Sequence, residues 1–191
     1  MDIAIKHISH NDDIMKDIIQ KVGECQIGKN QQSPFSYFVG LIIGQKIKFG
    51  MAKKIRSNMY TETKSYNFAP NDILNLTDEN WESIQIDSIQ KKNTIIKVAK
   101  YFIDNKVNPN KIKKNDLSEL HKISGIGIWT VSTFMIEYGI DNNLFPLNDK
   151  HVNKKLSELY NIDESDISEF IEKWSPYKSY AFWYLWKIGL N

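Results

Sequence analysis

The sequence contains one cysteine, Cys25, among 191 residues. A lone thiol cannot form an intramolecular disulfide, and it excludes a zinc or iron–sulfur site with four cysteine ligands. Such scarcity of cysteine fits a reducing, intracellular compartment. No apolar run approaches the length of about eighteen residues that a membrane-spanning helix needs, and the N-terminal residues are too polar for a signal peptide. We therefore expect an intracellular protein without a membrane segment.

Acidic residues are missing between Cys25 and Thr61, although the net charge of the whole chain is only +2. That stretch carries the basic residues Lys29, Lys46, Lys48, Lys53, Lys54 and Arg56. A second basic run lies between Lys106 and Lys114, and acids gather from Asp163 onward. A molecule with one basic face binds a polyanion despite a modest total charge. The alternative is that these lysines only cover solvated helix faces.

Strand signals are absent as well. No segment alternates apolar and polar residues between tight turns, whereas apolar residues recur at helical spacing. Ser33 and Pro34 have the residue types of an N-cap and a first helical position, and the segment after them is apolar nearly all round, which predicts a central buried helix. Further helices are expected over 50–60, 89–103, 128–138 and 163–174, and after Pro176. The fold class is therefore all-α, in a single domain over 1–191.

Local patterns predict the ends and the buried faces of these helices. Asp116 and Glu119 have the spacing of a capping box for a helix that begins near Leu120. Gly139 is expected to end the helix over 128–138. The buried stripes are expected to be Met51, Ile55 and Met59 in one helix, and Ile128, Val131, Met135 and Tyr138 in another. The tryptophans expected in the core are Trp81, Trp174 and Trp183.

A tight turn, Gly125-Ile126-Gly127, lies between two expected helical segments. Glycine at both ends lets the backbone enter conformations closed to other residues and removes side chains that would block a close approach. The amides of Gly125, Gly127 and Ile128 then face outward at the start of the next helix, where unpaired N–H groups attract an anion. The turn therefore predicts a phosphate-binding site.

A single aspartate, Asp149, follows this turn in the apolar context Phe-Pro-Leu-Asn-Asp. A phosphate-binding turn with a carboxylate at a fixed offset suggests chemistry on a nucleic acid. The alternative is that Asp149 only caps a helix through Asn153 and Leu156. Both roles can hold at once.

Three stretches carry a family resemblance. They are L-x-x-I-x-G-I-G-x-W-T followed by F-P-x-x-D-x-x-V, then P-F-x-x-x-V-x-x-I-I-G-Q at Pro34–Gln45, and the C-terminal EKWSPYKSYAFWYLW. They resemble the helix-hairpin-helix superfamily of DNA glycosylases over residues 33–191, and most closely the 3-methyladenine DNA glycosylase II branch. The resemblance implies two lobes, one over 33–140 with the hairpin and one over 1–32 and 141–191, with the active site in the cleft between them. We expect a monomer that acts on double-stranded DNA containing a damaged base.

The resemblance assigns the catalytic carboxylate to Asp149. A fixed anion stabilises the positive charge that develops on the sugar as the base departs, and it can orient or deprotonate the attacking water. Bifunctional members of the family carry a nucleophilic lysine where this chain has Trp129, so a monofunctional enzyme that leaves an abasic site is expected. Trp129 and Trp186 match aromatic residues of the base pocket, which would stack on the flipped, cationic ring of an alkylated purine. Thr133 stands at a pocket position that is tyrosine in some relatives.

The family also predicts DNA contacts outside the pocket. The residues expected to touch DNA are Gly125, Gly127, Ile128, Gln45, Lys46, Ile47, Lys53 and Lys54. In the family the segment after Gly44 fills the gap left by the flipped nucleotide. Here Lys46 would contact a phosphate, and Ile47 or a residue elsewhere would be the wedge. Gln45 is equally well explained as a helix C-cap. Four histidines without ligand spacing predict no metal site, and His151 is expected to be a solvated or phosphate-facing residue. No cofactor is expected, and a monovalent cation at the hairpin is an open possibility that the family raises.

Two other functions fit the same motifs. One is an 8-oxoguanine or uracil DNA glycosylase on the same scaffold, which a pocket richer in hydrogen-bond donors would favour. The other is a catalytically silent DNA-binding module that uses the hairpin for non-specific phosphate contacts. Retention of Asp149 within its motif argues against the silent module.

Overall fold

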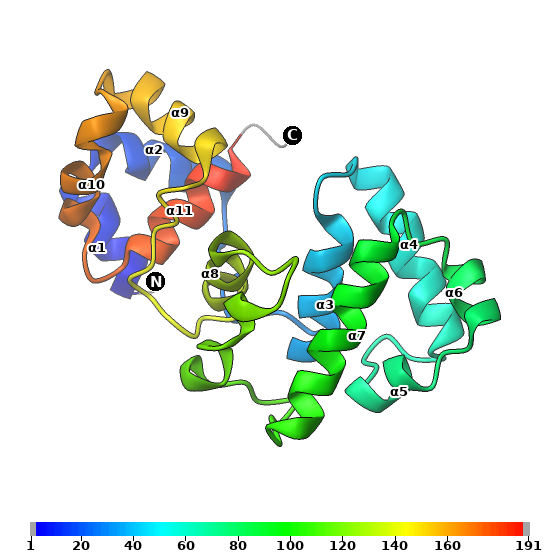
Figure 1. Ribbon diagram of the computed structural model, residues 1–191. Coiled ribbons are helices and arrows are strands. Elements are labelled where there is room, and N and C mark those ends of the chain that lie inside the picture. Colours follow the sequence, from blue (N-terminus) through cyan, green and yellow to red (C-terminus); the bar gives the residue numbers. More distant parts are fainter. Residues whose placement is uncertain (1–2, 189–191) are drawn as a thin grey trace. The chain divides into compact units, whose positions relative to one another are not determined.

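The described part of the chain, residues 3–188 of a computed structural model, consists of helices joined by turns and loops, with no strand (Figure 1). The all-α prediction is confirmed. The α-helices are α1 (Ile3–Asn11), α2 (Asp13–Val22), α3 (Pro34–Gly44), α4 (Phe49–Glu62), α5 (Pro70–Leu74), α6 (Asp78–Ile84), α7 (Ile89–Asp104), α8 (Ile128–Glu137), α9 (Lys150–Tyr160), α10 (Ile167–Phe170) and α11 (Lys178–Lys187). Short 3₁₀ helices are η1 (Lys114–Leu117), η2 (Leu120–Lys122), η3 (Glu164–Asp166) and η4 (Ile171–Trp174). Within residues 3–188, no helix has both the length and the apolar character needed to cross a bilayer.

The chain divides into two compact units. Unit 1 combines Met1–Asn30 with Met135–Asn191, and unit 2 is the continuous segment Gln31–Phe134. The division falls within α8, so this helix gives its first turns to unit 2 and its last turn to unit 1.

Unit 2 is built around α3. Ser33 caps this helix by accepting a hydrogen bond from the amide of Ser36, and Pro34 occupies its first turn, as predicted. The side chains of Phe35, Phe38 and Ile42 are fully buried, because α3 packs against both α4 and α7. Phe35 meets Phe102 of α7 edge to face, with ring centroids 4.9 Å apart. The predicted central helix is confirmed, and it holds the loop after its C-terminus in a fixed place.

Unit 1 packs α1, α2, α9 and α11 around a second core. Its centre contains Trp174 and Tyr184, which are among the largest fully buried side chains of the protein. Because α11 is buried on nearly all sides, its apolar sequence is explained by packing. Trp81 in unit 2 and Trp174 and Trp183 in unit 1 are all buried, as predicted.

Several local predictions are wrong. Asp116 does not cap a helix at Leu120: its carboxylate accepts from the amide of Lys113, three residues earlier, and closes η1. The segment 163–174, expected as one helix, is η3, α10 and η4 in succession. The apolar spacing was correct in that segment, but short 3₁₀ turns present a similar stripe.

Two predicted stripes are also only partly buried. Met51 is 53% exposed although Ile55 and Met59 are buried. Ile128 is 69% exposed at the start of α8, and the buried residues of that helix include Thr130, Thr133 and Phe134 instead. Both exposed residues lie in the first turn of a helix that begins at the end of a loop, where the helix has not yet entered the core. Gly139 ends α8 in the left-handed conformation, with φ of +63°, as predicted.

A buried carboxylate, Asp12, joins the helices of unit 1. Its Oδ2 accepts hydrogen bonds from Tyr160 Oη at 2.8 Å and from Trp174 Nε1 at 2.9 Å. The same oxygen forms an ion pair with Lys173 Nζ at 2.8 Å. Its Oδ1 caps α2 by accepting from the amide of Met15 at 3.0 Å. Burial alone would raise the pKa of Asp12, but the hydrogen bonds, led by that from Lys173, outweigh burial and hold the pKa below its ordinary value.

We predict that Asp12→Ala lowers the free energy of unfolding by about 3 kcal/mol, because buried donors lose their common acceptor. Since the folded pKa lies below the unfolded one, the contribution of Asp12 is complete above the ordinary pKa of 3.8 and is lost as the pH falls through the folded value. Urea unfolding at a series of pH values measures both effects.

The matched control is Asp13→Ala, which removes an exposed carboxylate from the first turn of the same helix. It should cost about 1 kcal/mol or less. Equal losses for the two variants would contradict the role assigned to the Asp12 network.

Candidate functional site

The turn at Gly125 is held by two neighbouring elements of unit 2. Gly125 has φ of +96°, and a Cβ added there would lie 2.4 Å from Thr94 Oγ1 of α7. The same hydroxyl donates to the carbonyl of Ser124 at 2.9 Å. On the other side, Gln45 Nε2 donates to the carbonyl of Gly125 at 3.2 Å and to Thr130 Oγ1 at 3.1 Å. The hairpin is therefore clamped between α7 and the end of α3.

The two hairpin glycines differ in backbone conformation. The prediction that both adopt conformations closed to other residues is therefore wrong for one of them. Only Gly125 has a positive φ, and a Cβ on Gly127 would meet no atom within 4 Å. Gly125, Gly127 and Ile128 are exposed, and their amides donate to no protein acceptor within residues 3–188. Gly125 thus shapes the turn, whereas the space beside the Cα of Gly127 is open.

The loop after α3 has its base fixed from two directions. Gln45 is the C-cap residue of α3, so the predicted alternative to a DNA contact is present in the structure. Lys91 Nζ donates to the carbonyl of Ile43 at 3.0 Å while pairing with Asp87 at 2.9 Å. Lys46, the next residue of the loop, is exposed and left-handed, with φ of +57°. A residue held in this sparsely populated conformation needs such support from its surroundings.

In unit 1, Asp149 is the N-cap of α9. Its Oδ1 accepts hydrogen bonds from the amides of His151 and Val152, both at 3.0 Å, and the residue is only 8% exposed. The alternative inferred from the sequence, that Asp149 caps this helix, is thus confirmed. The cap also fixes the carboxylate at the positive end of a helix dipole. His151 is exposed.

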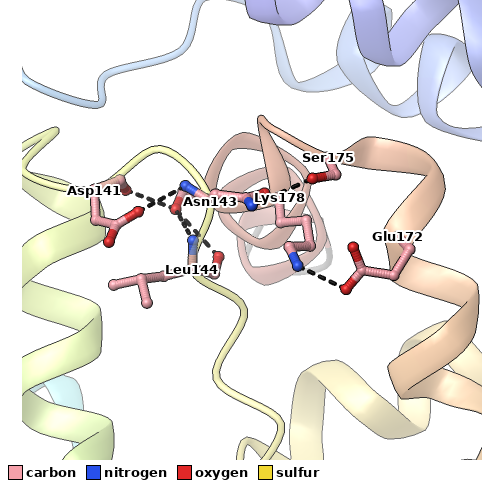
Figure 2. Close-up of polar contacts among 7 residues, drawn as sticks. Asp141, Asn143, Leu144, Glu172, Ser175 and Lys178 are labelled. Carbon is pink, nitrogen blue, oxygen red and sulfur yellow. Dashed lines mark hydrogen bonds and ion pairs between the residues drawn. The ribbon is translucent and has the colours of Figure 1, made fainter.

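The segment that leads to Asp149 is tied to the start of α11 (Figure 2). Ser179 is fully buried; its hydroxyl accepts from the amide of Leu144 at 2.9 Å and donates to the carbonyl of Asp141 at 2.8 Å. Asn143 adds a hydrogen bond to Ser175 Oγ at 3.2 Å. These contacts connect an irregular segment, which has no helical hydrogen bonds of its own, to a buried helix. They fix the path of the chain into the loop before Asp149.

Lys155 connects α9 to the other end of α11. Its Nζ donates to the carbonyls of Leu185, at 3.2 Å, and Ile188, the last carbonyl groups of that helix. Burial lowers the pKa of Lys155, and the negative charge of Asp149 opposes the shift. Asp149 caps the start of α9, and Trp186 lies at the C-terminal end of α11. The Lys155 hydrogen bonds therefore join two helices that each carry a predicted site residue.

The remaining predicted pocket residues differ in burial. Trp129 and Trp186 are half-buried, whereas Thr133 is only 3% exposed and its hydroxyl is enclosed. Trp129 and Thr133 belong to unit 2 and Trp186 to unit 1, so their meeting in one cleft stays a prediction.

Comparisons with known proteins point to one kind of enzyme. No family model matches the chain. An alkylbase DNA glycosidase-like protein, mag2, of Schizosaccharomyces pombe is 24% identical over 97% of this chain and 92% of its own length. A crystal structure of a DNA-3-methyladenine glycosidase from Bacillus halodurans matches with a TM-score of 0.78 and 22% identity over 97% of this chain and 88% of that one. The S. pombe 3-methyladenine DNA glycosylase Mag1, in complex with abasic DNA, matches with a TM-score of 0.77 and 21% identity over 96% and 95%.

This chain has the DNA glycosylase fold. The match spans nearly the full length of both structures, so it includes the hairpin, the segment before Asp149 and the final helix. The resemblance inferred from the hairpin and aspartate motifs is therefore confirmed at the level of the fold.

Sequence reasoning missed several residues that shape the candidate site. Thr94, Lys91 and Lys155 act through contacts with residues distant in sequence, and no local pattern announces them. Phe49 was missed too: it is 77% exposed in the first turn of α4, between the exposed residues Lys48 and Gly50. The sequence did contain a signal for Phe49, because an aromatic residue stands at the start of an expected helix and within a basic run. Within residues 3–188, His, Cys, Asp and Glu side chains form no group of three that could hold a metal ion.

The hairpin geometry predicts opposite outcomes for its two glycines. Gly125→Ala should destabilise the protein by about 1–3 kcal/mol, because the positive φ is strained for alanine and the Cβ collides with Thr94. Gly127→Ala should leave the melting temperature nearly unchanged, since its Cβ meets only open space. Thermal unfolding of both variants tests this, and equal destabilisation would contradict the division of roles.

Proposed function

We propose that this protein is a monofunctional DNA N-glycosylase that hydrolyses the N-glycosidic bond of alkylated purines of the 3-methyladenine type in double-stranded DNA. The observation that carries the proposal is the Asp149 carboxylate, which two backbone amides hold in one orientation at the start of α9, the helix that Lys155 joins to the end of α11 that bears Trp186. The names of the relatives support the substrate class, since they include an alkylbase DNA glycosidase-like protein and DNA-3-methyladenine glycosylases.

The chemistry requires one fixed anion. As the bond between C1′ and the base nitrogen breaks, the electron pair leaves with the base and positive charge develops on the sugar. A carboxylate whose orientation is set by the amides of His151 and Val152 can stabilise this charge without reorganising. Water then adds to C1′, and Asp149 accepts or directs its proton. The products are the free base and an abasic site.

Trp129 supports hydrolysis rather than strand cleavage. An indole has no amine that could attack C1′, so no Schiff base forms at this position and water remains the nucleophile.

The proposed mode of DNA binding uses unit 2. The unpaired amides of Gly127 and Ile128 at the start of α8 suit a phosphate, and a Cβ on Gly127 would meet no atom within 4 Å. Lys46, Lys53 and Lys54 are exposed in the loop after α3 and in α4. The Gln45 hydrogen bond to Gly125 makes the loop and the hairpin one rigid element, so lysine and amide contacts would act on the same duplex. In this proposal Gln45 positions the hairpin, and Lys46, Ile47 and Phe49 face the DNA.

Asp149→Asn is the decisive substitution. Asparagine caps a helix about as well as aspartate but carries no charge. We predict that the variant keeps the melting temperature of the wild type and loses at least about a hundredfold in single-turnover base release, the scale of removing one key electrostatic group. Base release is measured on a panel of duplexes that each contain one lesion, including alkylated purines, 8-oxoguanine and uracil.

The panel also distinguishes the alternatives. Release of 8-oxoguanine or uracil, without release of alkylated purines, would replace the proposed substrate class. Absence of release from every lesion, with DNA binding retained, would identify a silent binding module. Asp149→Ala serves as the control for the cap, because it removes both the charge and the hydrogen bonds to α9 and should also lower stability by about 1 kcal/mol.

The basic residues of unit 2 predict a salt-dependent affinity. Alanine at Lys53 or Lys54 should weaken binding to duplex DNA uniformly across sequences. It should also reduce the slope of log affinity against log salt by about 0.9 for each phosphate that the variant no longer neutralises. Fluorescence anisotropy at several salt concentrations measures the slope.

Lys100→Ala is the matched control for this test. Lys100 is also an exposed lysine of unit 2, but it lies toward the end of α7 that is remote from Lys91 and the loop after α3. The Lys100→Ala variant should have the same slope of log affinity against log salt as the wild type. A wild-type slope for the Lys53 and Lys54 variants would place these lysines off the DNA surface.

A further inference from the structure

The sequence contains a single arginine, Arg56, which is half-buried in α4; the other members of its 25 lysine and arginine residues are all lysines. The fully buried residues of the same helix are Ala52, Ile55 and Met59. An arginine differs from a lysine in that its planar guanidinium presents several N–H donors in a fixed fork. This fork matches the paired oxygens of a phosphate or a carboxylate.

Two glycines of α3 form the surface on which the Arg56 side chain lies. A Cβ added at Gly40 would lie 3.6 Å from Arg56 Cδ, which is an ordinary contact. A Cβ added at Gly44, the last residue of α3, would lie only 2.9 Å from Arg56 Nη2, closer than a real Cβ comes to a neighbouring atom. The side chain therefore runs along α3 toward its C-terminus. Its terminal nitrogen takes the space that a side chain at residue 44 would fill.

The guanidinium of Arg56 has no anionic partner among residues 3–188. The ion pairs of unit 2 do not include it, and its Nε is enclosed without a hydrogen-bond acceptor, whereas the terminal nitrogens are not enclosed in this way. Lys91 joins Asp87 to the same end of α3, but both Asp87 oxygens accept from the Lys91 ammonium. An enclosed N–H without an acceptor costs stability, so an apolar side chain would serve the packing of α4 on α3 better than this arginine.

The chain around the guanidinium is basic. Lys46 and Lys48 are exposed in the loop that begins directly after Gly44. No acidic residue occurs between Cys25 and Thr61, a stretch that includes the whole of α3 and most of α4. Like charges that lie close together repel unless an anion lies between them. The end of α3 therefore suits an anion that another molecule supplies.

The same loop is joined to the hairpin, because Gln45 Nε2 donates to the carbonyl of Gly125 at 3.2 Å. A phosphodiester has two oxygens that are not esterified, and a guanidinium can bind both at once. The unpaired hairpin amides suit an anion of the same kind. A duplex backbone, which carries phosphates at a regular spacing, fits a surface with more than one such site.

We propose that Arg56 binds a backbone phosphate of the DNA duplex beside the loop after α3, and that Gly40 and Gly44 hold its guanidinium in place for this contact. The inference rests on the DNA binding within the proposed function and adds a fixed, bidentate contact to those of the exposed lysines. A side chain already placed by packing loses less freedom on binding than a flexible lysine does. Arg56 thus determines where the duplex backbone meets the loop.

A single arginine allows a direct chemical test. Phenylglyoxal modifies guanidinium groups, and mass spectrometry of peptides from the treated protein measures the modification of Arg56 alone. A short undamaged duplex should slow this reaction in proportion to the fraction of protein bound, and salt that releases the DNA should restore the rate. Equal rates with and without saturating duplex would overturn the proposal. So would a lack of modification in the free protein, because the terminal nitrogens would then be inaccessible.

Substitutions separate contact from simple shielding by nearby DNA. Arg56→Met should lower the affinity for the duplex about tenfold, the scale of a hydrogen bond to a charged group. It should also reduce the slope of log affinity against log salt by about 0.9, the value for one phosphate. Arg56→Lys should keep the slope and lose part of the affinity, because an ammonium lacks the fork. A wild-type slope in Arg56→Met would leave Arg56 a structural role only.

The role of the glycines is tested by Gly44→Ala, with Gly40→Ala as the matched control in the same helix. The Cβ at residue 44 displaces Nη2, whereas the Cβ at residue 40 makes an ordinary contact. Gly44→Ala should weaken DNA binding in the wild type and have no further effect in Arg56→Met, and Gly40→Ala should bind as the wild type does. An equal effect of Gly44→Ala in both backgrounds would show that it acts through the loop and would contradict the proposal.

These measurements depend on DNA binding alone, so they distinguish this inference from the proposed reaction. If DNA protects Arg56 but no lesion of the panel is excised, the proposed glycosylase activity fails and the phosphate contact stands. If lesions are excised but Arg56 is not protected, the phosphate contact fails by itself.

Discussion

The site depends on the pair of hydrogen bonds between the Asp149 carboxylate and the first amides of α9. They satisfy helix donors that would otherwise be unpaired in a largely buried position, and they hold the carboxylate in one orientation. The same bonds serve folding and the proposed reaction. An anion that is already oriented requires no reorganisation when positive charge develops beside it. The arrangement that caps α9 is therefore also the one that the proposed catalytic role of Asp149 requires.

Two sets of contacts join the chain around Asp149 to α11. Ser179, near the start of α11, binds the irregular chain at Asp141 and Leu144, and Lys155 reaches from α9 to the carbonyls at the helix end. Because α11 is buried on nearly all sides, it provides a rigid reference for the residues around it. An almost wholly apolar helix can therefore support the residues of the proposed site. Its C-terminal end carries Trp186 and Lys187, which are both half-buried.

Unit 2 follows a comparable design for its proposed phosphate site. Gln45 and Thr94 bind the backbone around Gly125 from two helices, so contacts from outside the turn hold the shape of the hairpin. The glycine that shapes the turn is distinct from the glycine that leaves space in front of it. Charge in this region comes from lysines on flexible side chains, whereas geometry comes from the fixed amides. Such a division suits a polyanion whose backbone is regular but whose sequence varies.

The sequence by itself determined the helical class, the buried centre at α3, the cap residues Ser33 and Asp149, and the end of α8 at Gly139. Each depends on residues within a turn or two of one another, so spacing and residue type are sufficient. The family motifs also predicted the glycosylase fold. The 3₁₀ segments of 163–174 were not predictable, because a 3₁₀ turn and an α-helix share nearly the same apolar spacing over so few residues. Only the tertiary structure decided that Gly125, and not Gly127, has a positive φ, that Gln45 binds the hairpin, and that the Lys187 ammonium lies over the Trp186 ring. These features depend on atoms brought together from distant parts of the chain, or on the direction of one side chain, and neither is encoded in local pattern.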